Sequence, residues 1–333
     1  MGSESFNVGI LGTGSCFPEK ILTNSDLEAM VDTTNEWILK RTGIRERRIL
    51  DDSQPAYEMG LEAAKKALED SSLEASQIDL ILVSTNSPDY LSPSTAAIIQ
   101  GKLGASNASA FDINAACSGF VYAAVTAEQF IKSGYYKYVL VISVEALSKI
   151  TDWKHRNTCV LFGDAAAAAV FGKVSDDTGL QSSWLGTDGT MSDVITVPCC
   201  FSSNEDRAQR VNGKEHVIRM DGSEVFKFAV RIMTEASLLV VEKASLTMDD
   251  VALIIPHQAN LRIIEGAAKR LGISEDKVFS ANIRKYGNTS SSSIPLALDE
   301  LSRSNSIIKG DNIVLVGFGG GLTWSAALIK WSI

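Results

Sequence analysis

Short apolar runs alternate with amphipathic stretches along this 333-residue chain. The apolar runs are rich in Val, Ile and Leu, as in IDLILVSTNSP, KYVLVISVEALS, VALIIPHQAN and DNIVLVGFGGGLT. Runs of this kind are typical of strands that helices cover on both faces. Because strands and helices alternate, we predict an α/β fold whose strands pair largely in parallel.

The second half of the chain repeats the pattern of the first. Helical stretches, YEMGLEAAKKALEDSSL and FAVRIMTEASLLVVEKASL, precede corresponding apolar runs, and further helices are predicted at 98–104 and 263–272. A strand and a tight turn then follow in each half, at 110–119 and 278–290. Two such copies predict a duplicated molecule of five layers, α-β-α-β-α, with halves at 1–175 and 176–333.

Two polar segments interrupt the repeat, a charged insertion at 20–60 and a predicted surface excursion at 199–217. The repeat also suggests where a site would lie. Cys117 and Asn288 occupy corresponding turns, and His257 ends the second copy of the strand that ends near Thr85. Because ligands of α/β sheets bind outside the strand ends, we expect these residues to converge where the halves meet.

Composition narrows the class of function. The net charge of −9 argues against nucleic acid as the main partner, because phosphate binding needs a positive surface. The chain shows no apolar run of about 18 residues and no secretory signal pattern, so we expect a cytoplasmic protein that does not span a membrane. The five cysteines include no CxxC pair, and only three histidines occur, so neither a disulfide scaffold nor a metal site is predicted.

Cys117 is the strongest candidate for chemistry. It follows the predicted strand AFDINAA and opens the amphipathic stretch CSGFVYAAVTAEQFIKSG, which places it at a helix N-terminus. The helix dipole favours a thiolate there, so we expect the pKa of Cys117 to be lowered. The alternative is inert packing, which is common for free cysteines and is our interpretation of the other four, Cys16, Cys159, Cys199 and Cys200.

Two polar residues of the second half are candidate partners of Cys117. His257 follows an apolar strand in PHQANLRI, and Asn288 lies in YGNTSSSS, ahead of serines suited to cap a helix. Each has a simpler alternative, a loop histidine bonded to backbone and a plain Gly-Asn turn. The remaining histidines, His155 and His216, lie among polar residues and are interpreted as surface residues.

The glycines 319–321 follow the apolar strand IVLVGF. Without side chains, their backbone N–H groups can approach a ligand closely. They match neither GxGxxG nor a Walker A loop, which makes nucleotide phosphate a weak interpretation. An N–H donor for an oxyanion is the sharper hypothesis.

Together these motifs resemble the β-ketoacyl-acyl-carrier-protein synthase III family of the thiolase-like fold. FDINAACSGF, PHQANLRI, YGNTSSSS and GFGGGLTW occur in the family's order, together with VDTTNEWILKRTGIRERR and LFGDAAAAAV. The resemblance covers essentially the whole chain. It implies the duplicated five-layer thiolase-like architecture, usually as a homodimer, and no cofactor.

The resemblance also implies a two-stage reaction that starts fatty acid synthesis. Cys117 takes the acyl group of an acyl-CoA, and malonyl-acyl carrier protein then loses CO₂ and attacks the acyl-enzyme. His257 and Asn288 would donate hydrogen bonds to the enolate oxygen formed on decarboxylation. The backbone N–H groups of Cys117 and Gly320 would form an oxyanion hole for the acyl-Cys carbonyl.

Recognition of CoA is implied for residues that match the family's motif. Trp37 and Arg156 match the pair that sandwiches adenine, Thr33 and Arg41 match adenine or phosphate contacts, and Asn260 matches a pantetheine contact. Trp37 has a simpler alternative as a partly buried packing residue. Asn157 departs from the family, where a Gly is common after the arginine.

An acidic carrier protein requires a basic landing site on this acidic chain. Arg262, Lys269 and Arg270 lie on one predicted helix and Lys227 and Arg231 on another, at positions that match the family's docking patch. The alternative is an ordinary solvated helix face.

Ser92 stands where some family members place a bulky aromatic that limits the acyl pocket across the dimer. A small residue there predicts a wider pocket, which accepts primers longer than acetyl.

Other functions stay open at this stage. A family member of a secondary-metabolite pathway, which condenses or merely transfers other acyl units, is the nearest alternative. A catalytically silent partner subunit would need none of Cys117, His257 and Asn288, so their presence argues against it. A papain-like hydrolase also uses Cys, His and Asn, but the duplicated α/β pattern does not suit it.

Overall fold

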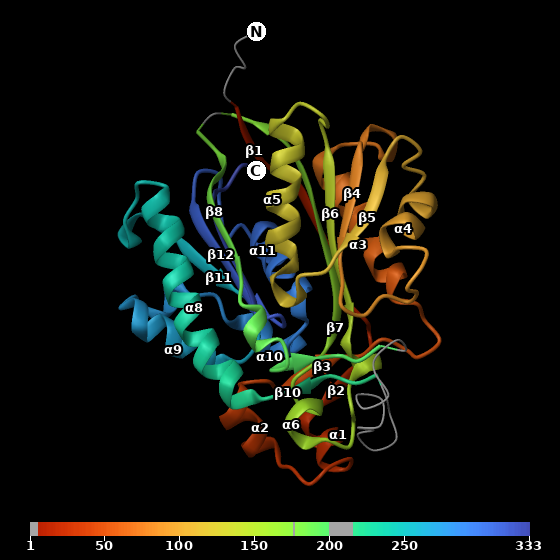
Figure 1. The fold of residues 1–333 in the computed structure, drawn as a ribbon, viewed down its shortest axis with the longest axis vertical. Coiled ribbons are helices and arrows are strands. Elements are labelled where there is room, and N and C mark those ends of the chain that lie inside the picture. The colour runs from red at the N-terminus through yellow and green to blue at the C-terminus, as the bar shows by residue number, and fades with distance from the viewer. Residues whose placement is uncertain (1–5, 176, 200–215) are drawn as a thin grey trace.

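The structure is a computed structural model that describes residues 6–175, 177–199 and 216–333. Two large sheets form its frame (Figure 1). Their strands are β1 (Asn7–Cys16), β4 (Leu80–Ser84), β5 (Ser109–Ile113), β6 (Val139–Ala146), β7 (Asp164–Val174), β8 (Gly179–Thr187), β11 (Leu253–Pro256), β12 (Asn312–Gly319) and β13 (Thr323–Lys330). The five-stranded sheet has the order β1-β7-β6-β4-β5, and the four-stranded sheet has the order β11-β12-β13-β8.

Helices cover both faces of each sheet. They are α3 (Ala56–Ser71), α4 (Thr95–Leu103), α5 (Gly119–Lys132), α8 (Gly222–Lys243), α9 (Leu261–Leu271) and α11 (Ser293–Arg303). α3 and α4 pack outside the five-stranded sheet, and α8 and α9 pack outside the four-stranded sheet. Between the sheets, α5 and α11 share one apolar core with strands of both. The five layers, visible across Figure 1, confirm the predicted architecture.

Local sequence explains these elements. β4 and β6 are buried at every position, as continuous apolar runs between two helix layers should be. α9 begins at the N-cap Asn260 and ends at Gly272, whose φ of 70° provides the left-handed conformation of a helix C-terminus. Its buried residues, Ile263, Ile264, Ala267 and Ala268, form one apolar stripe.

The expectation of largely parallel pairing is wrong. In the two large sheets three strand pairs are parallel and four are antiparallel. β12 and β13 are joined by residues 320–322 alone, a connection too short for the crossover that parallel neighbours need. Each half therefore ends in an antiparallel strand, and both sheets are mixed.

The duplication extends to strand order. Reading β8-β13-β12-β11 against β1-β7-β6-β4 pairs every strand of the smaller sheet with one of the larger. Only β5 lacks a full counterpart, since its equivalent is a single bridge between Val278 and Ile254. The predicted strand within 278–290 is wrong beyond that bridge, because α10 (Ala281–Tyr286) buries Ile283 and Tyr286 at helical spacing instead.

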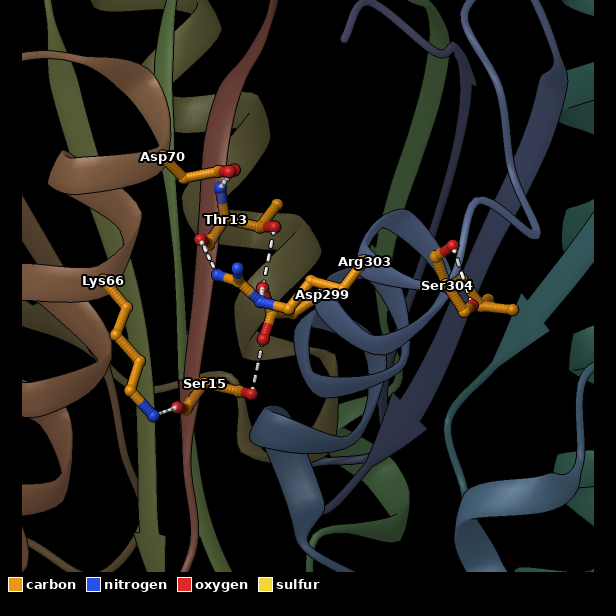
Figure 2. Close-up of polar contacts among 8 residues, drawn as sticks. Thr13, Ser15, Lys66, Asp70, Asp299, Arg303 and Ser304 are labelled. Atoms are coloured by element: carbon orange, nitrogen blue, oxygen red, sulfur yellow. Dashed lines mark hydrogen bonds and ion pairs between the residues drawn. The ribbon is translucent and has the colours of Figure 1, made fainter.

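Side chains from both halves cover the outer edge of β1 (Figure 2). Asp299 of α11 accepts hydrogen bonds from the Thr13 and Ser15 hydroxyls and from Arg303 Nε. Arg303 Nη2 also donates to the Thr13 carbonyl, and Asp70 of α3 accepts from the Thr13 N–H. These bonds satisfy backbone groups that an edge strand would otherwise expose, and they tie α11 of the second half to β1 of the first.

A cap of short elements closes the lower end of the molecule in Figure 1. It consists of β2 (Ile21–Thr23), α1 (Asn24–Glu28), α2 (Asn35–Thr42), β3 (Glu46–Arg48), α6 (Arg156–Cys159), β9 (Ile195–Thr196), β10 (Arg219–Met220) and α10. Its elements share a small apolar core that includes Leu27, Ile38, Phe162 and Ile283. The predicted insertion at 20–60 supplies most of this cap. Of the predicted excursion at 199–217, only residues 199, 216 and 217 lie within the described part of the chain.

Candidate active site

Cys117 lies in a tight turn between β5 and α5. The turn is a 3-10 helix, Ala116–Ser118, and Ala116 enters it with a left-handed φ of 49°. The hairpin between β12 and β13 packs directly on it, because a Cβ placed on Gly319 would lie only 2.6 Å from the Cys117 nitrogen. Thr323 adds a hydrogen bond of 2.9 Å from its hydroxyl to the Ala115 carbonyl. A strand end of the second half thus fixes the cysteine turn of the first.

The Cys117 sulfur is held as a thiol. Burial raises the pKa of Cys117 to about 12, and the nearby charge of Glu145 acts in the same direction. The Ser290 hydroxyl, which donates to Sγ at 3.2 Å, lowers this pKa. The predicted lowering of this pKa is therefore wrong. The helix dipole argument considered only the local turn, whereas the buried surroundings of the sulfur disfavour its charged form more strongly.

His257 follows β11 directly and is buried. Its backbone N–H donates to the Val316 carbonyl at 2.7 Å, and its ring makes a T-shaped contact with Phe318 at a centroid distance of 5.4 Å. Burial lowers the pKa of His257 to about 3. The imidazole is therefore neutral near pH 7, with one ring nitrogen that donates a hydrogen bond and one that accepts.

Ser293 governs which ring nitrogen of His257 carries the proton. Its hydroxyl lies 2.8 Å from Nδ1 and 2.9 Å from the Ser290 carbonyl oxygen. Because the hydroxyl has one proton, it donates to only one of these acceptors at a time. When it donates to Ser290, Nδ1 is protonated and Nε2 is a bare acceptor; when it donates to Nδ1, Nε2 carries the proton. Nε2 is in both cases the nitrogen left for a ligand.

Asn288 is fixed through its backbone and its side-chain oxygen. It forms a bridge with Phe162, in which its N–H donates to the Leu161 carbonyl at 2.8 Å. Its Oδ1 accepts from the Ser290 N–H at 2.8 Å. Nδ2 has no hydrogen-bond partner among the described residues, which leaves an oriented amide donor.

Cys117, His257 and Asn288 all line one cavity of about 1360 Å³. The turn Ser290–Ser292 and the adjacent Ser293 connect them, because they bond to the cysteine sulfur, the histidine Nδ1 and the asparagine oxygen. The structure therefore brings the three predicted catalytic residues together. Gly320 also lines the cavity, as the oxyanion hypothesis requires.

The predicted CoA-binding residues divide into two groups. Trp37, Arg41 and Asn260 line the cavity, whereas Thr33 and Arg156 do not. Arg156 lies beside it, with its guanidinium 4.9 Å from the centre of the Trp37 ring and a hydrogen bond of 3.0 Å to the Asp32 carbonyl. Asn260 also caps α9, because its Oδ1 accepts from the Arg262 N–H at 2.9 Å.

The predicted docking residues lie on α8 and α9. Lys227 and Arg262 line the cavity, and the Arg262 guanidinium lies 5.5 Å from the centre of the Phe226 ring. Lys269 and Arg270 are exposed in the last turn of α9, away from the cavity lining. Two of the five cations have local partners: Lys227 pairs with Glu224 at 2.7 Å and Arg231 with Glu235 at 3.1 Å.

Several other predictions concern single residues. Ser92 is exposed and does not line the cavity of the single chain. His155 and His216 are exposed, as predicted, but both line the cavity.

The other cysteines differ in their surroundings. Cys159 is buried and Cys16 is half-buried, whereas Cys199 is exposed and lines the cavity, so buried packing does not describe Cys199. Cys200 lies outside the described residues.

Sequence reasoning missed the polar residues that support the site. These are Asn86 and Glu145 of the first half and Ser290, Ser291 and Ser293 of the second. From the sequence alone, the serines are expected only to cap a helix. A usable signal was present at Glu145, because a carboxylate within the apolar run VLVISVEA requires buried donors.

Over residues 6–175, 177–199 and 216–333, no three His, Cys, Asp or Glu side chains are grouped so that they could hold a metal ion. In the same ranges, every helix is too short or too polar to cross a membrane.

Comparison with known proteins places these features in a family. Residues 111–189 match the family described as 3-Oxoacyl-[acyl-carrier-protein (ACP)] synthase III, and residues 241–331 match its C-terminal family. A protein of Caldanaerobacter subterraneus subsp. tengcongensis, named beta-ketoacyl-[acyl-carrier-protein] synthase III, is 53% identical over 99% of both chains.

Solved structures agree with this result. The 3-oxoacyl-[acyl-carrier-protein] synthase III of Aquifex aeolicus VF5 is 44% identical, with a TM-score of 0.90 over 97% of this chain and 100% of that one. The priming β-ketosynthase of the R1128 polyketide pathway is 36% identical, with a TM-score of 0.90 over 100% of this chain and 99% of that one. The chain belongs to the β-ketoacyl-acyl-carrier-protein synthase III family of thiolase-like condensing enzymes.

Proposed function

We propose that this chain starts fatty acid synthesis by condensing an acyl-CoA with malonyl-acyl carrier protein. The observation that carries the proposal is the single cavity into which a thiol, a neutral imidazole and an oriented amide all face. These groups suit an acyl-enzyme step followed by a decarboxylation. The names of the relatives, which include the carrier protein, support the substrate class.

In the first stage, Cys117 Sγ attacks the thioester carbonyl carbon, and the bond from that carbon to the CoA sulfur breaks. Because burial favours the thiol form of Cys117, its proton must leave as the new bond forms. His257 Nε2, when bare, is suited to accept the proton and return it to the departing CoA sulfur. The N–H groups of Cys117 and Gly320 would hold the oxyanion.

In the second stage, the malonyl carboxylate leaves as CO₂, and its electron pair moves into a thioester enolate. His257 Nε2–H and Asn288 Nδ2–H would donate to the enolate oxygen. The enolate carbon then attacks the acyl-Cys carbonyl, and Cys117 leaves as the product forms. The stage needs the tautomer with a protonated Nε2, which the Ser293 hydroxyl stabilises when it donates to Nδ1.

Trp37, Arg41, Arg156, Thr33 and Asn260 form the proposed CoA site. The 4.9 Å between the Arg156 guanidinium and the Trp37 ring corresponds to direct contact. An adenine can lie between them only after Arg156 moves away. When CoA binds, Trp37 would therefore lose its contact with Arg156 and stack on the adenine ring instead.

The proposed carrier-protein surface comprises Lys227, Arg262, Lys269 and Arg270. Lys227 and Arg262 at the cavity would receive the phosphopantetheine end, and the cations at the end of α9 would face the acidic protein. Rim charges of this kind act mainly on the association rate, so the effect should weaken at high salt.

We further propose a homodimer that forms through β5. This strand lies at the outer edge of the five-stranded sheet, where Phe111 is 40% exposed. Leu91, which lines the cavity, is 67% exposed and would be covered by a second copy. Apolar edge strands favour pairing with another chain. Sedimentation should show a dimer that Phe111→Glu dissociates, and a monomeric wild-type protein would refute this part.

We propose that the small side chain of Ser92 leaves the acyl pocket wide. Acyl-CoA primers longer than acetyl should therefore react at least as well as acetyl-CoA. A strict acetyl preference would contradict this assignment.

A secondary-metabolite role is the second candidate, favoured by the likeness to the R1128 priming ketosynthase. One experiment addresses both. The protein is incubated with acetyl-, butyryl-, isobutyryl- and octanoyl-CoA, and its intact mass is measured before and after malonyl-acyl carrier protein is added. An acyl adduct on Cys117 that disappears as 3-ketoacyl-carrier protein forms supports condensation, and adducts that move unchanged to the carrier indicate mere transfer. No adduct with any primer would reject both.

A further inference from the structure

A buried carboxylate lies behind the Cys117 turn. Glu145 of β6 has no exposed surface, and four hydrogen bonds converge on it. Its Oε1 accepts from Asn86 Nδ2 at 3.0 Å and from the Ser291 hydroxyl at 2.7 Å. Its Oε2 accepts from the Asn86 N–H and the Ser87 hydroxyl, both at 3.0 Å. Burial raises the pKa of Glu145, whereas these hydrogen bonds act in the opposite direction and favour the carboxylate. In all four bonds Glu145 is the acceptor, so the position suits a group that only accepts.

Asn86 connects this carboxylate with the cysteine. Its side-chain nitrogen carries two protons, and Nδ2 lies 3.0 Å from Glu145 Oε1 and 3.0 Å from Ser290 Oγ. The Ser290 oxygen therefore accepts from Asn86. Its own single proton is then free to point at Cys117 Sγ, 3.2 Å away.

The direction of every bond in this series follows from the carboxylate. Glu145 can only accept, so the Asn86 amide must present nitrogen, not oxygen, to the centre of the site. An amide turned the other way would accept from Ser290 and draw the hydroxyl proton away from the sulfur. Loss of this hydrogen bond would destabilise the charged states of Cys117 most, because a donor stabilises a sulfur anion more than a neutral thiol.

We propose that Glu145 and Asn86 are positioning residues, which orient the Ser290 hydroxyl so that it stabilises negative charge on Cys117 Sγ. The proton stays on Ser290 throughout. The charge develops when the thiol is deprotonated and again when the acyl group leaves the sulfur. The catalytic role of this orientation rests on the proposed acyl-Cys chemistry. The effect of the Ser290 hydroxyl on the charge of the free Cys117 sulfur does not depend on that chemistry.

The test is alkylation of the full-length protein by iodoacetamide, without substrate, between pH 6 and pH 10. Peptide mass mapping separates Cys117 from the other cysteines. Ser290→Ala and Asn86→Ala should displace the Cys117 rate profile to higher pH by about one to two units, because each removes a donor to an anion or its orientation. Below the midpoint this equals a rate about 10- to 100-fold lower at a given pH.

Ser292→Ala is the matched control. It deletes the same hydroxyl from the same buried turn, but Ser292 donates only to the Ala165 carbonyl, at 2.9 Å, and does not join the series. Its profile should coincide with that of the wild type. A purely structural role for Asn86 and Ser290 would leave all profiles alike after normalisation to the folded fraction, and that result would overturn the inference.

Asn86→Ser replaces Asn86→Ala if the latter does not fold. A serine has one hydroxyl proton, so it cannot donate to Glu145 and Ser290 together, and the same displacement is expected. The proposed function is tested separately by acylation of the wild-type protein. An unchanged alkylation profile with normal acylation would reject only the inference, whereas a displaced profile without acylation by any primer would reject only the proposed reaction.

Discussion

Two turns of this molecule have nearly the same backbone but different tasks. Ala116–Ser118 in the first half and Ser290–Ser292 in the second both begin with a residue at φ 49°, and both lead into a helix of the middle layer. Each is preceded by an asparagine whose Oδ1 accepts a backbone N–H two residues on, at 3.3 Å from Asn114 and 2.8 Å from Asn288.

The two turns differ in what their middle residue does. Cys117 presents its sulfur to the cavity, whereas the equivalent Ser291 is fully buried and donates to Glu145. The duplication thus placed the same backbone turn in both halves. In one half the turn carries the reactive group, and in the other half it carries a side chain that supports the site. Mutations at matched positions can test this division.

Cys117→Ala should have the largest effect. It removes the atom that becomes acylated, so condensation should fall by at least about 10⁴-fold. Intact-mass measurement should show no adduct with any acyl-CoA, while circular dichroism stays that of the wild type. An acyl adduct on this variant would show that another residue is the nucleophile.

Asn288→Ala should come next. Loss of one preorganised donor to the enolate should slow decarboxylation of malonyl-acyl carrier protein about 10²- to 10³-fold, while Cys117 is still acylated. CO₂ release and acyl-adduct formation, measured separately, check this. Asn114→Ala removes the equivalent asparagine of the other turn and should leave decarboxylation within about tenfold, since only a neutral bond to backbone is lost. Equal losses in both variants would show that the two asparagines are not specialised.

Ser293→Ala should act on the chemistry through His257, although it also removes the hydrogen bonds of the hydroxyl with the Ser290 carbonyl and the Gln258 N–H. Without the hydroxyl, Nδ1 loses its partner and the proton is no longer directed to Nε2, so decarboxylation should slow by about tenfold, the value of one neutral hydrogen bond. Because burial lowers the pKa of His257 to about 3, its ionisation should leave the decarboxylation rate unchanged between pH 6 and 8 in both proteins. A rate that rises or falls across this range with a histidine titration would contradict a neutral imidazole.

Gly319→Ala probes the contact between the halves. The added Cβ would meet the Cys117 nitrogen at 2.6 Å, so we expect a loss of about 1–3 kcal/mol in the free energy of unfolding as the hairpin shifts. Urea unfolding measures it. Gly101→Ala in α4, where a Cβ meets nothing within 4 Å, should not destabilise the protein.

Ser291→Ala should have the smallest effect. It leaves Glu145 with three donors, so the free energy of unfolding should drop by about 1–2 kcal/mol while acylation stays within a few-fold. Thermal unfolding and adduct formation give the two values. A loss of acylation as large as that of Cys117→Ala would mean that the second turn takes part in the chemistry itself.

Much of the fold was predictable from local pattern. The continuous apolar runs and the repeated order of helices suffice for the five layers, because burial on both faces leaves little choice of architecture. Pairing direction was not predictable in the same way, since it depends on connection length. The strand predicted after Val278 is a helix instead, because ANIRKY buries Ile283 and Tyr286 at a spacing that also suits a helix. The assignment of each half as a separate domain stays a prediction.

The site was predictable in its reacting residues but not in their support. Cys117, His257 and Asn288 follow apolar runs at matching places in the two halves, which made them candidates, and the resemblance to the family implied their roles. Asn86 and Glu145 meet Ser290 and Ser291 only through tertiary packing of the two halves, so no spacing along the chain reveals them. The direction of the Cys117 pKa shift was missed for the same reason, because burial is a property of the whole fold.

The missing counterpart of β5 has a consequence for assembly. A perfect duplication would give the molecule two exposed edge strands, one in each half. Each molecule could then pair with a neighbour at both edges, and the pairing could continue into a fibre. In this chain the second edge strand is reduced to the bridge at Val278, and β1 is covered by Asp299 and Arg303. Association through the outer edge of β5, by contrast, would use that edge in both copies, so it would stop at two.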